Sequence, residues 1–144
     1  MHHFIKILFL SSSLLLAAHI LHAQMPPRVQ ISVSTQSNDV FNPIGKYIVK
    51  GDAECLSAWF DDNLEISVSS RESNASRAQA KRIIKTFFER HTPQSFTITH
   101  AAQKANMKYA LGTLDAGGET FSVTIFVSEK GNSYKIQQLK IEQR

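Results

Sequence analysis

The stretch Ser76–Phe96, SRAQAKRIIKTFFERHTPQSF, decides the fold because it joins an amphipathic helix directly to a strand. Ser76 followed by Gln79 is a capping box, which predicts that the helix begins here. Pro93 ends the helix, because the residue before a proline is driven toward extended geometry. Apolar residues at three- and four-residue spacing form one stripe, made of Ala80, Ile83, Ile84, Phe87 and Phe88.

This apolar stripe needs a large apolar partner, and the strands that follow Ser95 are the surface that can cover it. Burying one Ile or Phe of the stripe is worth about 1.5–3 kcal/mol before ordering entropy is counted. The opposite side of the helix carries Arg77, Lys81 and Lys85, which we expect to form a solvated face. An acidic partner or headgroup for these three cations is the alternative.

Alternating apolar residues after the helix predict four strands joined as meandering hairpins. The first strand is expected at Ser95–Ala102 and the second at about 107–114. Asp115–Gly118 is a strong hairpin turn, and Lys130–Ser133 turns the chain again. The longest strand lies between these turns and alternates through Phe121, Val123, Ile125 and Val127.

The last strand contains two apolar pairs of different parity. Tyr134 and Ile136 form one pair, whereas Leu139 and Ile141 form the other. All four can face the core only if the strand carries a bulge near Gln137-Gln138. A bulge also bends a sheet, so this strand is expected to let the sheet curve around the helices.

The first half of the domain predicts two helices and a strand before the central helix. The helices lie within Asn38–Phe60, where Gly51 closes the first and Asp52 caps the second. Leu64–Val68 alternates as a half-buried strand, and Arg71–Ala75 is interpreted as a polar loop. The apolar stripe expected on the second helix consists of Leu56, Trp59 and Phe60.

The N-terminal residues have the pattern of a secretory signal peptide. Met1–Ala23 combines a short basic start, an interrupted apolar core and a small residue at the cleavage position, so we expect cleavage after Ala23. Residues 24–37 are interpreted as a linker or an edge strand, and residues 38–144 as one domain. The sequence thus predicts an exported protein, periplasmic or secreted, without a membrane anchor once the signal is removed.

Composition and charge narrow the classes of function. The formal net charge of +4 is scattered, without the basic stripe or basic–aromatic interleaving of a nucleic-acid-binding protein. One cysteine, Cys55, rules out an intramolecular disulfide, and we expect its thiol to be buried and inert. The histidines and the cysteine have no zinc-ligand spacing, so we predict neither a metal site nor a cofactor.

The order of elements, together with the segment GDAECLSAWFDDNLEIS at Gly51–Ser67, resembles the nuclear transport factor 2-like superfamily. Ketosteroid isomerases and scytalone dehydratases share its cone-shaped fold, and within it the chain is similar to small exported bacterial proteins of unassigned function. The resemblance implies an α+β fold, in which a curved and mainly antiparallel sheet wraps around about three helices. It transfers no catalytic residue, because the matching positions are turns, caps and core residues.

His100 is the single candidate for chemistry. It shares strand parity with Phe96 and Ile98, so we expect it to point into the cone, where it could act as a base or contact a ligand. The alternative is a strand-end histidine bonded to backbone or water. Further candidates for lining a ligand pocket are Tyr109, Tyr47 and Trp59. His91 is interpreted as a cap at the C-terminal end of the central helix.

These features favour a non-catalytic binding or interaction domain over an enzyme. Such a domain would hold a small apolar ligand in the cone or a protein partner on the open sheet face. The alternatives are a small isomerase- or dehydratase-like enzyme that uses His100, and a structural homodimer formed through the sheet without a ligand.

Overall fold

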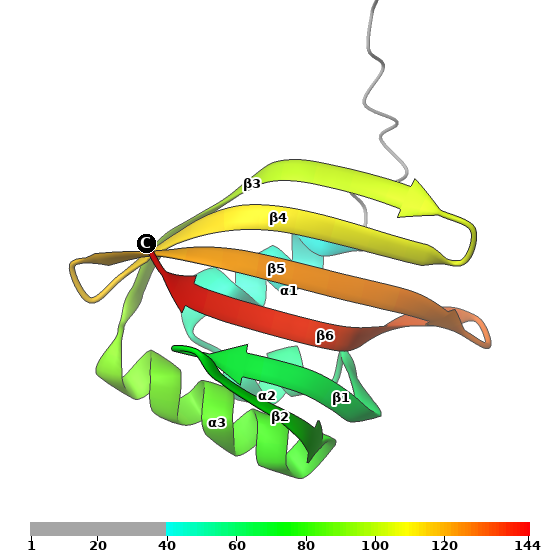
Figure 1. Cartoon of the computed structure of the whole chain (residues 1–144), viewed down its shortest axis with the longest axis horizontal. Coiled ribbons are helices and arrows are strands. Elements are labelled where there is room, and N and C mark those ends of the chain that lie inside the picture. Colours follow the sequence, from blue (N-terminus) through cyan, green and yellow to red (C-terminus); the bar gives the residue numbers. More distant parts are fainter. Residues whose placement is uncertain (1–39) are drawn as a thin grey trace, which may run out of the picture. The chain divides into compact units, whose positions relative to one another are not determined.

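The computed structural model describes residues 40–144 (Figure 1). The predicted signal peptide and the predicted linker or edge strand at 24–37 lie outside the described residues. Along the chain the elements are α1 (Phe41–Lys50), α2 (Ala53–Ser57), β1 (Phe60–Val68), β2 (Arg71–Ser76), α3 (Arg77–Arg90), β3 (Pro93–Lys104), β4 (Met107–Ala116), β5 (Glu119–Lys130) and β6 (Ser133–Gln143).

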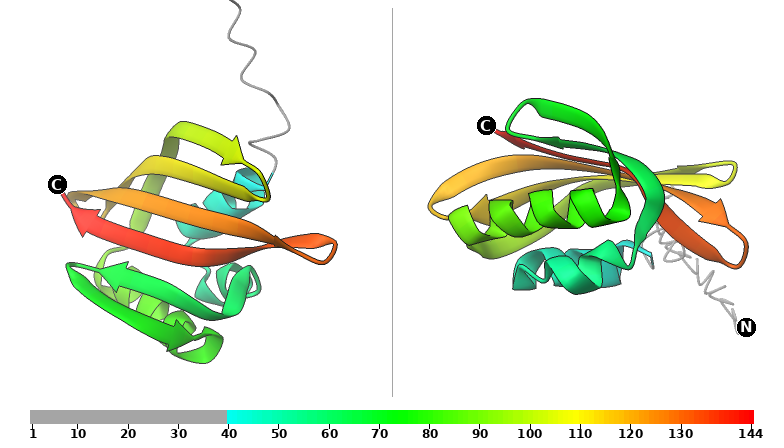
Figure 2. Two further views of the ribbon diagram at one scale, coloured as in Figure 1. Left: turned by 45° about the vertical axis from the view of Figure 1, so that its right-hand side comes forward. Right: turned by 90° about the horizontal axis from the view of Figure 1, so that it is seen from below.

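The six strands form one curved, open sheet with the order β2-β1-β6-β5-β4-β3. Strands β3 to β6 are consecutive antiparallel hairpins, as the alternating sequence predicts. The pairing of β1 with β6 is parallel, with Ile66 opposite Leu139 and Val68 opposite Ile141. The helices lie against one face of the sheet and leave the other open (Figure 2). The predicted α+β class and mainly antiparallel curved sheet are therefore confirmed.

Helix α3 forms as its sequence predicts. The Ser76 hydroxyl accepts a hydrogen bond from the Gln79 backbone N–H, and the Gln79 side chain accepts one from the Ser76 N–H, which completes the capping box. The helix ends at Arg90 with His91 as its C-cap, and Pro93 begins β3. Its buried residues are Ala80, Ile84, Phe87 and Phe88, while Ile83 is half-buried at the side of the stripe.

The basic side of α3 is only partly a solvated face. Arg77 contacts Asp62 and Lys81 contacts Glu54, each with a 2.9 Å N–O distance, whereas Lys85 is exposed. The acidic partners of two of these cations are therefore residues of the same domain. Exposed pairs of this kind contribute at most about 1 kcal/mol, so they orient α3 on β1 and α2 more than they stabilise it.

The junction of α1 and α2 follows the predicted caps. Gly51 has a φ of 63°, the left-handed conformation that ends a helix at low cost, and its N–H bonds to carbonyls of α1. The Asp52 side chain accepts a hydrogen bond from the Cys55 N–H and begins α2. The second helix is shorter than expected, because Phe60 already belongs to β1, where it pairs with Ile136.

The prediction of a loop at Arg71–Ala75 was wrong, because these residues form the edge strand β2. Two features of the sequence explain why it does not predict the β1–β2 hairpin. The turn residues Ser69 and Ser70 have φ values of 51° and 62° without the glycine or asparagine that usually indicates such a turn. Strand β2 is exposed at its first four positions and therefore lacks an apolar alternation.

The predicted bulge in the last strand is confirmed. Phe126 pairs with Gln138 and Val127 with Ile136, so Gln137 is the extra residue of β6. Because of this bulge, Ile136, Leu139 and Ile141 are all buried.

A continuous core of apolar side chains fills the space between the helices and the inner face of the sheet. Its largest members come from every layer of the domain, and Phe41, Phe60 and Phe121 are each less than 2% exposed. Strand β5 alternates as predicted, with all four inward residues buried. The interior of the cone is therefore occupied by the protein itself, and open space is found at its surface.

Candidate functional site

His100 does not point into the cone, contrary to the expectation from strand parity. Strand β3 has a register shift between Ile98, opposite Gly112, and His100, opposite Leu111. Gly112 faces the core and Leu111 faces outward, so this bulge moves His100 to the outer face of the sheet. The alternation of apolar residues alone does not reveal such a shift, because the sequence shows no bulge signal at this point.

On the outer face His100 meets one of the other predicted residues. Its Nε2 lies 3.2 Å from the Tyr109 hydroxyl, and the Tyr109 ring stacks on Phe126 with 5.6 Å between centroids. His100 is exposed and Tyr109 is half-buried. The pair is a surface contact between neighbouring strands, without the enclosed space in which a histidine base is most effective.

The remaining two predicted pocket residues lie elsewhere. Tyr47 belongs to α1, and Trp59 lies between α2 and β1; both are half-buried and pack against the core. The Trp59 carbonyl accepts a hydrogen bond from the Ile136 N–H, which links β1 to β6. The structure thus brings together two of the four residues, His100 and Tyr109, and gives Tyr47 and Trp59 packing roles.

His91 has the predicted cap position at the end of α3. Its backbone N–H bonds to the Phe87 carbonyl, and its Nδ1 lies 2.9 Å from a carboxylate oxygen of Glu119. The ring stacks obliquely on Phe87 and edge-on to Phe121, with centroids 4.9 and 5.1 Å away. His91 therefore joins the end of the helix to the start of β5.

The expectation of a buried thiol was wrong, because Cys55 is exposed. It occupies the first turn of α2, where the Asp52 carboxylate caps the helix. A hydrogen bond to that carboxylate is the main cause that raises the pKa of the Cys55 thiol. The raised pKa disfavours the thiolate, which is the nucleophilic form of a cysteine.

Asp61 is a buried carboxylate that sequence reasoning did not single out. It accepts hydrogen bonds from Lys130 Nζ at 2.6 Å and from Gln137 Nε2 at 2.7 Å. Burial alone would raise the pKa of Asp61, but these hydrogen bonds outweigh burial and lower it. Asp61 ties the start of β1 to the β6 bulge and the β5–β6 turn, which is a structural function.

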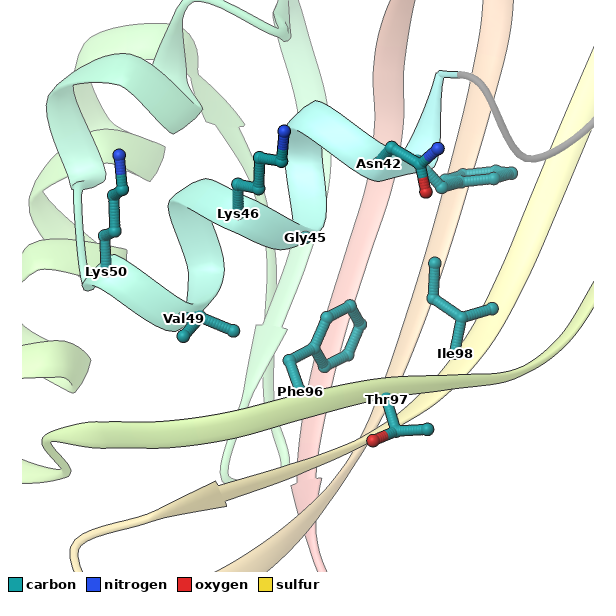
Figure 3. A pocket seen from close by; sticks show the side chains of 9 residues that line it. Asn42, Gly45, Lys46, Val49, Lys50, Phe96, Thr97 and Ile98 are labelled. Atoms are coloured by element: carbon teal, nitrogen blue, oxygen red, sulfur yellow. The ribbon is translucent and has the colours of Figure 1, made fainter.

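Among the surface hollows of the described domain, two grooves have volumes well inside the usual range for small-molecule sites. One lies between α1 and β3 and has a volume of about 620 Å³ (Figure 3). Its apolar lining includes Phe96 and Ile98, but the side chains of Lys46 and Lys50 point away from these two residues (Figure 3). The charged and apolar parts of this groove therefore do not converge on one ligand.

The other groove lies between α3 and the β1–β2 hairpin and has a volume of about 670 Å³. We call it the arginine groove. Val68, Ile83 and Phe87 give it an apolar floor, and the remaining lining residues are Ser69, Arg71, Glu72, Ser73, Arg82, Thr86, Arg90 and His91. Apolar and cationic groups face the same space, which is the arrangement that a ligand with two chemical ends requires.

The sequence contains a pattern that belongs to this groove. Arg82, Thr86 and Arg90 are spaced by four residues and therefore share one face of α3. Their opposing wall is β2, which sequence reasoning treated as a loop. Without the hairpin, the arginines on α3 had no wall facing them and could not be recognised as part of a groove.

Within residues 40–144 no group of three or more His, Cys, Asp or Glu side chains has the proximity needed to hold a metal ion. No helix of that part of the chain is long and apolar enough to cross a membrane.

Comparisons with known proteins place the domain in a family. The model of the family DUF4783, a domain of unknown function, matches residues 41–142. The chain belongs to this family. No functionally curated protein matches it in sequence.

Solved structures of DUF4783 proteins have the same fold. A protein from Bacteroides uniformis is similar with a TM-score of 0.68 and 20% identity, over 71% of this chain and 94% of that one. Another from Bacteroides ovatus has a TM-score of 0.69 and 21% identity, over 72% and 94% of the two chains. An NTF2-like protein of unknown function from Silicibacter pomeroyi is similar with a TM-score of 0.55 and 15% identity, over 73% and 90%. The DUF4783 domain described here therefore has an NTF2-like fold.

Proposed function

We propose that this DUF4783 protein is an exported, non-catalytic binding domain that takes a small ligand with an apolar part in the arginine groove. The observation that carries the proposal is the apolar floor of Val68, Ile83 and Phe87, which lies open between α3 and the hairpin. The groove volume of about 670 Å³ falls within the usual range for small-molecule sites.

The location of the ligand differs from the cone interior that the fold resemblance implies. Apolar side chains such as Phe41 and Phe121 fill that interior. A ligand there would have to displace close-packed residues, at a cost comparable to overpacking a core. The arginine groove is open without such displacement.

A non-catalytic function fits the placement of the titratable residues. A proton-transfer site needs a base, a partner that orients it and a pocket that excludes water. His100 and Tyr109 provide a contact on an exposed face, and His91 is paired with Glu119 at the end of a helix. The Asp61 carboxylate accepts a hydrogen bond from Gln137 in the β6 bulge, which is a structural contact.

Binding of a neutral fluorescent probe, N-phenyl-1-naphthylamine, to the full chain tests the proposal. We expect a saturable rise in fluorescence that Thr86→Trp abolishes, because Thr86 lines the groove and an indole there fills it. Lys85→Trp is the matched control, since the neighbouring side chain is exposed and does not line the groove. Equal binding by all three proteins would place the probe elsewhere and contradict the proposal.

Export follows from the sequence of Met1–Ala23 alone and is part of the same proposal. Fractionation of the host cell should recover the protein outside the cytoplasm, with Gln24 as its first residue by N-terminal sequencing. Recovery from the cytoplasm with Met1 intact would contradict export.

A second candidate, a homodimer formed through the sheet, is favoured by the outer-face cluster. We define this cluster as His100, Met107, Tyr109, Leu111 and Phe126. It contains two of the three exposed large apolar residues of the described domain, Met107 and Leu111. Light scattering after size-exclusion chromatography should give a dimer that Leu111→Glu dissociates and Val49→Glu does not. A monomeric wild-type protein would exclude this candidate.

A further inference from the structure

We propose that the ligand of the arginine groove is a free anionic amphiphile, with a carboxylate-like head held by arginines and an elongated apolar tail along α3. This inference rests on the proposed function and adds the chemical class of the ligand.

Positive charge predominates in the lining of the groove. Arg71 comes from β2, and Arg82 and Arg90 come from α3, against a single carboxylate, Glu72, in the lining. Three cations from two elements that face each other raise the local concentration of anions in the space between them.

These arginines are also available for a ligand. In residues 40–144 the cations of the ion pairs are Arg77, Lys81, Lys130, Lys140 and His91, and none of them is an arginine of the groove. Arg71, Arg82 and Arg90 make no side-chain hydrogen bond within the described domain either. Lys85 and Lys104 make no ion pair with described residues either, but these three guanidinium groups share one groove.

Guanidinium groups favour a particular kind of head group. A guanidinium presents parallel N–H donors that match the two oxygens of a carboxylate, and such charge-assisted bonds are about twice as strong as neutral ones. Arg82 and Arg90 are two helical turns apart, so they can engage an anion at either end of the floor that Ile83 and Phe87 form between them.

The shape of the groove fits an elongated tail. A smaller hollow of about 340 Å³ continues it along α3 and shares Ser73, Arg82 and Ile83 with it. The combined groove reaches from His91 to Gln79, twelve positions apart, which corresponds to about 18 Å of helix. An alkyl chain that lies along this path covers Ile83 and Phe87.

A free molecule fits the surroundings of the groove better than a lipid in a membrane. The exposed large apolar residues of the described domain are Val49, Met107 and Leu111, and none of them lines the groove. A surface that inserts into a bilayer needs apolar residues around the headgroup site, whereas this groove is bordered by polar and charged side chains.

The test uses the full chain and displacement of N-phenyl-1-naphthylamine by three amphiphiles with the same tail: dodecanoate, dodecanol and dodecyltrimethylammonium. We expect dodecanoate to displace the probe at a concentration about tenfold lower than dodecanol, and the cationic amphiphile to be the weakest. The advantage of dodecanoate should decrease as salt is added, because exposed charges are screened.

The variant Arg82→Gln/Arg90→Gln should remove most of the advantage of dodecanoate over dodecanol, because Arg71 alone remains, and it should leave displacement by dodecanol unchanged. Lys85→Gln/Lys104→Gln is the matched control, because it removes two exposed cations outside the groove and should keep the preference. Circular dichroism and Tm should be unaltered in both variants, since none of these side chains is buried or ion-paired.

The outcomes separate the two proposals. If dodecanol and dodecanoate displace the probe equally from the wild-type protein, the groove binds apolar ligands and the anionic class is wrong. If no amphiphile displaces a probe that Thr86→Trp blocks, the amphiphile class is wrong although the groove binds a small apolar ligand. If Thr86→Trp leaves probe binding unchanged, both proposals fail. Arginine-dependent cosedimentation with phosphatidylglycerol vesicles, without displacement by dodecanoate, would overturn the free amphiphile in favour of a membrane surface.

Discussion

At the scale of single residues, Gly112 shows how a missing side chain shapes the inner face of the sheet. It lies buried in β4 opposite Ile98, and the ring of Phe96 occupies the space above it. A Cβ at this position would lie 2.6 Å from the Phe96 ring and 2.9 Å from the Thr97 carbonyl oxygen. The glycine is therefore required by the close approach of β3, and its backbone conformation is not left-handed.

Gly112→Ala should destabilise the domain by about 1–3 kcal/mol, because overpacking a closed core displaces backbone as well as the ring. Urea denaturation measures the change. Gly45→Ala is the control, since its Cβ would lie 3.3 Å from the same ring, and the helix propensity gained in α1 offsets the crowding. A loss of stability at Gly45 as large as that at Gly112 would contradict this explanation.

Asp61 gives the domain a specific dependence on pH. Its pKa is lowered from 3.8, so its contribution to the free energy of unfolding is present above that value and is lost as pH falls through the lower folded pKa. Asp61→Asn should cost about 1–3 kcal/mol at neutral pH, because the bonds from Lys130 and Gln137 lose their charged acceptor.

Urea denaturation of both proteins between neutral pH and about pH 3 checks this sign. The difference in free energy of unfolding should shrink on acidification, as Asp61 of the wild-type protein becomes protonated. A difference that stays constant or grows at low pH would show that the carboxylate charge does not stabilise the fold.

At the scale of elements, the two bulges have opposite consequences. The bulge at Gln137 brings residues of different parity onto the core face of β6, whereas the bulge after Ile98 turns His100 away from it. The bulge in β3 also interrupts the open edge of the sheet, which opposes the addition of another strand.

Deletion of Gln137 should remove the bulge and still permit folding, because Ile136, Leu139 and Ile141 would then alternate regularly and keep facing the core. Gln137→Ala keeps the bulge and loses one hydrogen bond to Asp61, so it should fold with a cost of about 1 kcal/mol. Dispersion of the amide signals in a two-dimensional NMR spectrum shows whether each variant folds. A collapsed spectrum for the deletion alone would show that the fold needs the bulge itself and not only the parity that the bulge restores.

At the scale of the whole molecule, the sheet is packed on one side. Helices and core cover its inner face, while the outer face is open and carries half-buried residues (Figure 2). The stabilisation from apolar burial therefore comes mainly from the inner face of the sheet. The arginine groove lies at one edge of that face, where α3 meets the β1–β2 hairpin.

Substitutions of Phe121 and Phe126 on β5 compare the contributions of the inner and outer faces of the sheet to stability. Phe121→Ala should cost about 3–5 kcal/mol, because the ring is buried and packs edge-on to Phe87 at 5.1 Å. Phe126→Ala should cost about 1 kcal/mol, since it removes a stack on Tyr109 at the surface. Thermal unfolding of dilute protein provides the comparison, and similar losses for the two variants would contradict a one-sided core.

The sequence by itself determined the elements whose signals are local. The capping box of Ser76, the stop after α3, the hairpin turns and the parity change at Gln137 each lie within a few residues, and each is found where it was predicted. These signals were sufficient for the α+β class and for the resemblance to the NTF2-like fold.

Tertiary structure alone decided the features that depend on neighbours distant in sequence. The side of the sheet that His100 faces depends on a bulge whose register is set by pairing with β4. The exposure of Cys55 and the burial of Asp61 depend on which elements cover them. The arginine groove exists because β2, which has no apolar pattern of its own, pairs with β1 and so comes to face α3. A sequence specifies local geometry directly, but a binding surface is formed only when packing places separate elements side by side.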